Sequence, residues 1–223
     1  MQRENRGFMT VSKNWQIMPK ELFTMGPIVP VLVINKVEDA LPIAEALLAA
    51  DVRVLEVTLR TPAALDVISA IAKELPEAII GSGTVTNRQQ LQQSVDAGAK
   101  FAISPGLTKD LLQAGNEGNI ALIPGISSIS ELMDASDFGY DHLKFFPAEA
   151  SGGVNAIKSI GGPFPDIKFC PTGGININNV RDYLALSNVA CCGGSWLVPN
   201  SVVESKNWSE ITKLANQALA FVK

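Results

Sequence analysis

Hydrophobic and polar positions alternate along this chain in a repeating order. Short apolar runs rich in β-branched residues are each followed by a longer run in which apolar residues recur with a helical period. The short runs predict buried strands, and the longer runs predict amphipathic helices. Strands are expected at residues 28–34, 53–58, 78–82, 101–104, 121–124, 142–146, 167–170 and 189–193.

Eight strand and helix pairs without a break in composition indicate an α/β protein folded as one closed (β/α)8 TIM barrel. The alternative is an open doubly wound sheet, which normally has fewer strands and a nucleotide-binding glycine motif after the first of them. Residues 34–37 carry no such motif. We expect residues 13–223 to form this single domain, with an extra N-terminal helix within residues 15–25.

Local signals refine the ends of these elements. Thr61 precedes Pro62, which predicts a capping hydroxyl followed by a proline in the first turn of a helix. Residues 1–12 are polar and are expected to form a flexible arm, and Met9 is an alternative start of the chain.

The composition narrows the class of protein. Hydrophobic residues make up 47% of the 223 residues and charged residues 18%, with a net charge of -4. This excludes a disordered chain and favours strands covered on both faces. The sequence contains no apolar run of membrane-spanning length and no signal peptide, so we expect a cytoplasmic protein that does not bind membranes. The acidic balance also argues against nucleic-acid binding.

Metal and cysteine chemistry are disfavoured. Cys170, Cys191 and Cys192 do not have the spacing of metal ligands, and we expect reduced cysteines in the core. The only histidine, His142, leaves little material for a zinc site or for Ser/His/Asp catalysis.

Two lysines interrupt apolar strands. Lys144 lies in the string KFFP (144–147) and Lys168 in the parallel string KFCP (168–171). Burial disfavours the ammonium form of a lysine, which makes its amine a nucleophile that can condense with a ketone. The alternative is a lysine whose tip reaches water at a barrel end. The pattern alone does not choose between the two lysines.

An acid and a base also stand at the end of the second strand. Glu56 is either a general acid/base or one half of an ion pair with Arg53 or Arg60. The planar fork of Arg60 suits a substrate carboxylate, and the alternative is a surface arginine at a helix start.

Glycines and small hydroxyl residues follow the last two strands, namely Gly173, Gly174, Gly194 and Ser195. Free backbone N–H groups in the seventh and eighth loops of such barrels often bind phosphate. The two loops together favour a phosphorylated ligand.

These strings together resemble the 2-keto-3-deoxy-6-phosphogluconate (KDPG) aldolase and 4-hydroxy-2-oxoglutarate (KHG) aldolase family of class I aldolases. The resemblance extends from about residue 15 to the C-terminus. It is carried by the strings VLEVTLR (54–60), GTV (83–85), FAISPG (101–106), KFFPAE (144–149), FCPTGGI (169–175) and GGSWLVP (193–199).

The resemblance implies a role for each matching residue. Lys144 would be the Schiff-base lysine, which excludes Lys168, and Glu56 the acid/base. Arg60 and Thr84 would position the substrate and its carboxylate. The pocket would be lined by Pro105, Phe146 and Thr172. Phosphate would be bound by Gly173, Gly174, Gly194 and Ser195.

The same resemblance implies an activity and an assembly. The enzyme would cleave KDPG reversibly to pyruvate and glyceraldehyde 3-phosphate without a metal or organic cofactor, and would form a homotrimer. Three alternatives remain open: a preference for KHG, which lacks the phosphate, a preference for a stereoisomeric sugar acid, and a catalytically silent barrel that serves as a scaffold.

Overall fold

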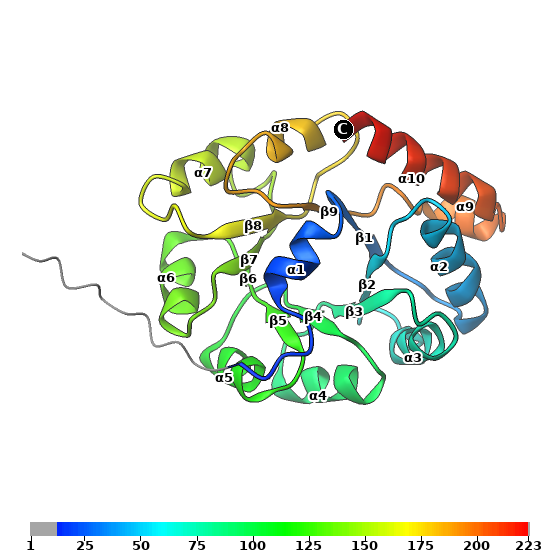
Figure 1. Cartoon of the computed structure of the whole chain (residues 1–223), viewed down its shortest axis with the longest axis horizontal. Coiled ribbons are helices and arrows are strands. Elements are labelled where there is room, and N and C mark those ends of the chain that lie inside the picture. The colour runs from blue at the N-terminus through cyan, green and yellow to red at the C-terminus, as the bar shows by residue number, and fades with distance from the viewer. Residues whose placement is uncertain (1–12, 223) are drawn as a thin grey trace, which may run out of the picture.

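Strands and helices alternate in a computed structural model that describes residues 13–222 (Figure 1). The arm expected at residues 1–12 lies outside the described residues. The strands are β1 (Ile28–Leu32), β2 (Val54–Thr58), β3 (Ile79–Gly83), β4 (Phe101–Ile103), β5 (Ala121–Ile123), β6 (Gly125–Ile126), β7 (His142–Phe145), β8 (Lys168–Pro171) and β9 (Cys192–Gly194). The helices are α1 (Pro19–Thr24), the 3-10 turn η1 (Val37–Asp39), α2 (Ala40–Leu48), α3 (Ala64–Glu74), α4 (Arg88–Asp96), α5 (Lys109–Glu117), α6 (Ile129–Asp137), α7 (Gly153–Ile160), α8 (Val180–Leu184), α9 (Asn200–Glu204) and α10 (Trp208–Val222).

The strands pair in parallel because helical crossovers return the chain to the same end of the sheet. Six strands follow the order β5-β4-β3-β2-β1-β9, and three follow the order β6-β7-β8. The strands curl around a common centre, and helices α2 to α10 lie outside them (Figure 1). The predicted α/β class with parallel strands is confirmed.

The strand predicted at residues 121–124 differs from the structure at Pro124. The chain pairs with β4 before this residue, as β5, and with β7 after it, as β6. Proline has no N–H to donate to a sheet, so it interrupts the ladder. Its carbonyl still accepts a hydrogen bond from the Lys144 N–H at 2.9 Å. Pro124 is therefore the point at which the chain passes from one sheet to the other.

The strand predicted at residues 189–193 begins later, at Cys192. Val189 forms only a single bridge with Phe169, and a second bridge joins Thr172 to Gly193. These bridges bring the end of β8 beside β9.

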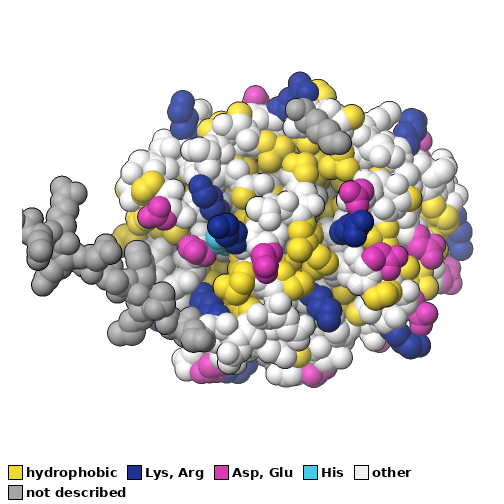
Figure 2. Space-filling model, viewed as in Figure 1, with side chains coloured by type: hydrophobic (Ala, Val, Ile, Leu, Met, Phe, Trp, Pro, Cys, Tyr) yellow, Lys and Arg dark blue, Asp and Glu magenta, His cyan; other side chains and the backbone are white. Residues whose placement is uncertain are grey.

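The amino ends of the strands are covered by α1, which is shorter than the segment 15–25 in which it was expected. Phe23 of α1 packs edge-on against His142, the first residue of β7, with ring centroids 5.2 Å apart. In Figure 1, α1 lies in front of the strands. Figure 2 shows hydrophobic side chains and charges of both signs interspersed on this face. The carboxyl ends of the strands therefore lie on the opposite side of the protein.

Packing on both faces of the strands explains the low charge of the sequence. Every residue of β1 and β2 is buried, as expected for parallel strands between two apolar layers.

The predicted helix cap at Thr61 is wrong, because α3 begins at Ala64 and the Thr61 hydroxyl donates instead to the Ile34 carbonyl at 2.7 Å. Among residues 13–222, no helix is long and apolar enough to cross a membrane.

Candidate functional site

Lys144 and Glu56 form a buried ion pair between β7 and β2. Lys144 Nζ donates to Glu56 Oε1 at 3.2 Å, and the side chains are only 7% and 1% exposed. Burying two charges costs several kcal/mol per ion by desolvation, and the mutual attraction often does no better than a pair of apolar side chains. Such a pair adds little net stability to the fold, and it is a good candidate for a catalytic pair.

Glycines neighbour this pair in the sheet. Lys144 is in register with Gly125 of β6 and Glu56 with Gly81 of β3. At Gly83, a Cβ would overlap the Glu56 carboxylate, so only glycine fits there. Gly83 thus leaves the space that the Glu56 carboxylate occupies.

Two residues predicted to line the pocket lie beside Lys144. Its ammonium is 5.4 Å from the centroid of the Phe146 ring, within the range of a cation–π contact. The backbone of Pro105 packs against Gly125, the register partner of Lys144, where a Cβ would overlap the Pro105 carbonyl. The structure therefore places Phe146 next to the candidate nucleophile and Pro105 against the glycine that pairs with it.

Arg60 and Thr84 extend from the ends of β2 and β3. Arg60 Nε donates to the Thr58 hydroxyl at 3.2 Å, and Thr58 donates to the Leu32 carbonyl at 2.9 Å. Thr84 follows Gly83 directly and has a φ of 62°, a left-handed conformation that is costly for a β-branched residue. Strain of this kind gathers at functional sites.

The predicted phosphate loops lie side by side after β8 and β9. Buried Thr172 bridges Gly193, where a Cβ would overlap the threonine hydroxyl. Gly173 and Gly174 have φ values of 100° and 79°, which favour glycine. Among residues 13–222, neither of their N–H groups has a hydrogen-bond acceptor.

Gly194 and Ser195 complete this pair of loops. Gly194 lies against the Trp196 ring, and Ser195 is exposed. The structure therefore brings the residues predicted for phosphate to adjacent strand ends, where the N–H groups of Gly173 and Gly174 have no acceptor among residues 13–222.

Glu149 lies between the loops after β7 and β8, although nothing in the sequence pattern gave it a role. Its carboxylate accepts a hydrogen bond from the buried Tyr183 hydroxyl, and a Cβ on Gly174 would lie 2.6 Å from its Cγ. Its N–H also donates to the Gly173 carbonyl at 3.1 Å. Glu149 thus ties the loop after β7 to the loop after β8. Its place in the string KFFPAE was the only signal in the sequence.

The structure separates the two strand lysines. Lys168 is the first residue of β8, pairs with His142 at the amino end of β7 and donates to the Ser187 carbonyl at 3.0 Å. It lies away from Glu56, which pairs with Lys144. The alternative of an ion pair between Glu56 and Arg53 or Arg60 is not what the structure shows: Arg53 binds Asp51 at 2.8 Å, Arg60 binds Thr58, and Glu56 binds Lys144.

The three cysteines are buried and free, as predicted. A hydrogen bond with Cys170, together with burial, raises the pKa of the Cys191 thiol well above its usual value. Burial likewise raises the pKa of Cys192. These thiols stay protonated and are therefore poor nucleophiles. Within residues 13–222, no three His, Cys, Asp or Glu side chains gather as ligands for a metal ion.

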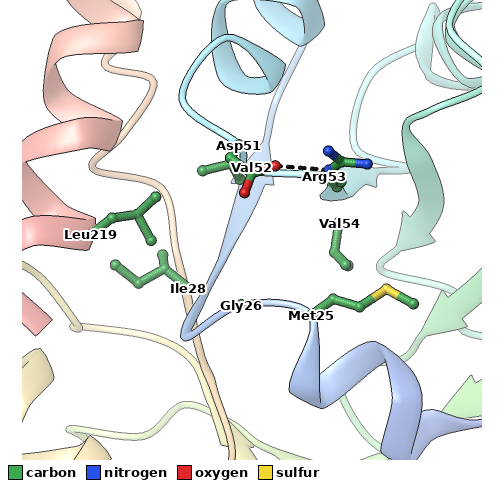
Figure 3. Close-up of a pocket in the computed structure, with 8 residues that line it drawn as sticks. All are labelled: Met25, Gly26, Ile28, Asp51, Val52, Arg53, Val54 and Leu219. Carbon is green, nitrogen blue, oxygen red and sulfur yellow. Dashed lines mark hydrogen bonds and ion pairs between the residues drawn. The ribbon is translucent and has the colours of Figure 1, made fainter. Parts of the chain in front are cut away.

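Two surface hollows lie apart from these residues. One, at the amino ends of β1 and β2, is lined by Ile28, Val54 and Leu219 beside the Asp51–Arg53 pair (Figure 3). Its volume of about 10 Å³ holds at most one water molecule. A groove of about 620 Å³ between α4 and α5 is wider, but it contains none of the predicted site residues.

Known proteins resemble this chain over most of its length. A family model described as "Aldolase: KDPG and KHG aldolase" matches residues 20–214. The 2-dehydro-3-deoxy-phosphogluconate aldolase of Pseudoalteromonas atlantica is 66% identical over 210 residues, which cover 94% of this chain and 98% of the relative.

Two solved structures share its fold. KDPG aldolase from Legionella pneumophila, with pyruvate captured as a covalent carbinolamine intermediate, matches with a TM-score of 0.91 and 51% identity over 92% of this chain and 100% of that one. The Zymomonas mobilis aldolase with 3-phosphoglycerate matches with a TM-score of 0.85 and 45% identity over 91% and 95% of the two chains. The chain therefore belongs to the KDPG and KHG aldolase family, as its motifs predicted.

Proposed function

We propose that this protein is a class I aldolase that cleaves KDPG reversibly to pyruvate and glyceraldehyde 3-phosphate, with Lys144 as the Schiff-base residue. The observation that carries the proposal is the buried contact of Lys144 Nζ with the Glu56 carboxylate at 3.2 Å. The covalent pyruvate carbinolamine of the Legionella pneumophila relative supports it, because such an adduct is the first product of a carbonyl with an amine.

Imine formation is the first stage of the reaction. Lys144 gives a proton to Glu56, and the free amine attacks C2 of the substrate ketone. A C–N bond forms, and the carbonyl oxygen becomes the hydroxyl of a carbinolamine. Protonation of this hydroxyl expels water and leaves a protonated imine, which is the electron sink for the next stage.

Carbon–carbon cleavage follows. Glu56, directly or through a water molecule, removes the proton of the C4 hydroxyl. The C3–C4 bond breaks, its electron pair moves to the imine nitrogen, and glyceraldehyde 3-phosphate leaves. The remaining enamine takes a proton at C3, and hydrolysis of the imine releases pyruvate and free Lys144. General acid–base catalysis of this kind contributes roughly 10²- to 10⁴-fold.

The surrounding residues bind and orient the substrate. Arg60 and Thr84 bind the carboxylate end, and Pro105, Phe146 and Thr172 line the pocket. The N–H groups of Gly173, Gly174 and Gly194, with the Ser195 hydroxyl, bind the phosphate. The 3-phosphoglycerate of the Zymomonas mobilis relative supports a site for a phosphorylated three-carbon group. KHG, which the family name includes, would be a poorer substrate because it lacks the phosphate.

The proposal also covers the detailed fold and the assembly of the protein. The change of sheet at Pro124 and the bridges Phe169–Val189 and Thr172–Gly193 support one closed (β/α)8 barrel domain with α1 as its extra N-terminal helix. We also propose a cytoplasmic homotrimer that needs no metal or organic cofactor and binds neither nucleic acid nor membranes.

Steady-state cleavage of KDPG and KHG tests this function. Pyruvate release is followed with and without a chelator, and kcat/KM is compared for the two substrates. We expect cleavage of both, a higher kcat/KM for KDPG and no loss with chelator. Activity lost with chelator would overturn the metal-free mechanism, and a higher kcat/KM for KHG would overturn the proposed phosphate site.

A further inference from the structure

We propose that Thr58 is a positioning residue that aims Arg60 at the substrate carboxylate. This inference rests on the proposed carboxylate-binding role of Arg60. Thr58 is only 2% exposed and lies at the end of β2, two residues before Arg60.

The Thr58 hydroxyl is committed in a definite direction. Its single proton is donated to the Leu32 carbonyl at 2.9 Å, so its lone pairs are left to accept. The donor that they meet is Arg60 Nε at 3.2 Å. The chain between them is also fixed, because the Leu59 N–H donates to the Gly83 carbonyl at 2.8 Å.

This contact leaves the useful part of the guanidinium free. With Nε engaged by Thr58, the Nη1 and Nη2 groups have no partner among residues 13–222, and they present a fork that matches a carboxylate. Arg60 is exposed, and a free arginine side chain loses considerable rotamer entropy when it binds. Holding the fork in place before the substrate arrives reduces this loss, which is the usual gain from preorganisation.

A second threonine supplies the control. Thr61 likewise donates its hydroxyl to a backbone carbonyl near the end of β1, that of Ile34, at 2.7 Å, but no hydrogen bond joins the Thr61 side chain to Arg60. Thr61→Val and Thr58→Val each leave one such carbonyl without its donor. Their difference therefore isolates the contact with Arg60.

The experiment compares KM and kcat for KDPG cleavage in Thr58→Val, Thr58→Ser and Thr61→Val. Losing one hydrogen bond to a charged group that acts equally on bound substrate and transition state should raise KM about tenfold and leave kcat within about twofold. We expect this result for Thr58→Val, recovery in Thr58→Ser, which keeps the hydroxyl, and KM unchanged in Thr61→Val. Thr58→Val with the same KM as Thr61→Val overturns the inference.

A double variant separates this inference from the proposed function. In an Arg60→Ala background, Thr58→Val should not raise KM further, because the residue through which it acts is gone. A normal KM in Arg60→Ala alone would instead refute the carboxylate-binding role of Arg60. If Thr58→Val does not fold, Thr58→Ala replaces it: alanine also lacks the hydroxyl but leaves room for a water molecule at the Leu32 carbonyl, so KM should again rise about tenfold, and an unchanged KM overturns the inference.

Discussion

Lys144 and Lys13 are two buried or partly buried lysines near opposite ends of the strands, and the groups around them differ. Lys144 faces the Glu56 carboxylate at 3.2 Å. Lys13 donates to the Gly139 carbonyl at 2.7 Å, with its ammonium 4.3 Å and 3.9 Å from the Trp15 and Tyr140 ring centroids. A carboxylate can accept a proton, whereas a carbonyl and two rings can only hold the amine in place. The comparison predicts that Lys144 takes part in catalysis and that Lys13 only holds the N-terminal segment against the rest of the protein.

The largest effect is expected at Lys144. Lys144→Met removes the nucleophile and should lower kcat/KM for KDPG cleavage by at least about 10⁴-fold. Lys168→Met is the matched control, because it changes the same position of a parallel string at the other end of the strands, and it should retain activity. Circular dichroism and thermal melting check that both variants fold. Substantial activity in Lys144→Met would end the proposed mechanism.

Glu56→Gln comes next. The amide cannot relay the proton, so kcat should fall by about 10²- to 10⁴-fold. Imine formation with pyruvate should survive, although more slowly, since Lys144 remains and water can take up its proton in place of Glu56. Equal turnover of Glu56→Gln and wild type would show that the carboxylate serves only as the ion-pair partner of Lys144.

A smaller, two-sided effect is expected at Thr84. Thr84→Gly relieves its left-handed backbone, so the free energy of unfolding in a urea titration should rise by about 1 kcal/mol. Loss of a substrate contact should raise KM roughly 3- to 10-fold. Asp51, at the amino end of β2 with a φ of 60°, is the control: Asp51→Gly should leave KM unchanged. A Thr84→Gly variant that is more stable and keeps its KM would remove Thr84 from the site.

The smallest effect is expected at Lys13. Lys13→Met should leave KDPG cleavage unchanged and the free energy of unfolding within about 1 kcal/mol of wild type at pH 7, because the lost cation–π contacts are offset by the removal of a partly buried charge. Burial lowers the pKa of Lys13 from 10.5 to about 8, against the opposing charge of Asp141.

The pH dependence of this variant has a definite sign. Between pH 8 and about 10, the unfolded chain binds more protons at Lys13 than the folded protein, so wild-type stability rises with pH relative to Lys13→Met. This gain in wild-type stability over Lys13→Met is lost as the pH falls through 8. Urea titrations of both proteins across this range measure the difference, in which the titrations of Asp141 and Tyr140 cancel. A constant difference would mean that the aromatic rings keep Lys13 charged.

The positions of the strands were predictable from the sequence because each is a short apolar run between two helical patterns. What the pattern did not contain was strand register. By sequence, Lys144 and Lys168 occupy the same place in parallel strings, but β8 is shifted so that Lys144 pairs with Cys170 and Lys168 with His142. This shift of two residues places Lys144 beside Glu56 and Lys168 at the amino end of the strands.

Contacts between segments far apart along the chain could likewise not be predicted from the sequence. The sequence suggested arginine partners for Glu56, yet its partner lies 88 positions away along the chain. Thr61 had the local signature of a helix cap, but the carbonyl of Ile34 competed for its hydroxyl. Thr58 carried no distinguishing signal at all, because its role depends on Leu32 and Arg60 meeting at one atom.

Trapping with pyruvate and borohydride would identify the lysine that forms the imine. The protein is incubated with pyruvate, reduced, digested and analysed by mass spectrometry, with a chelator present throughout. We expect one reduced pyruvate adduct, on the peptide that contains Lys144, and none on the peptides that contain Lys13 or Lys168. An unmodified Lys144 peptide, or an adduct on Lys168 in its place, would contradict this expectation.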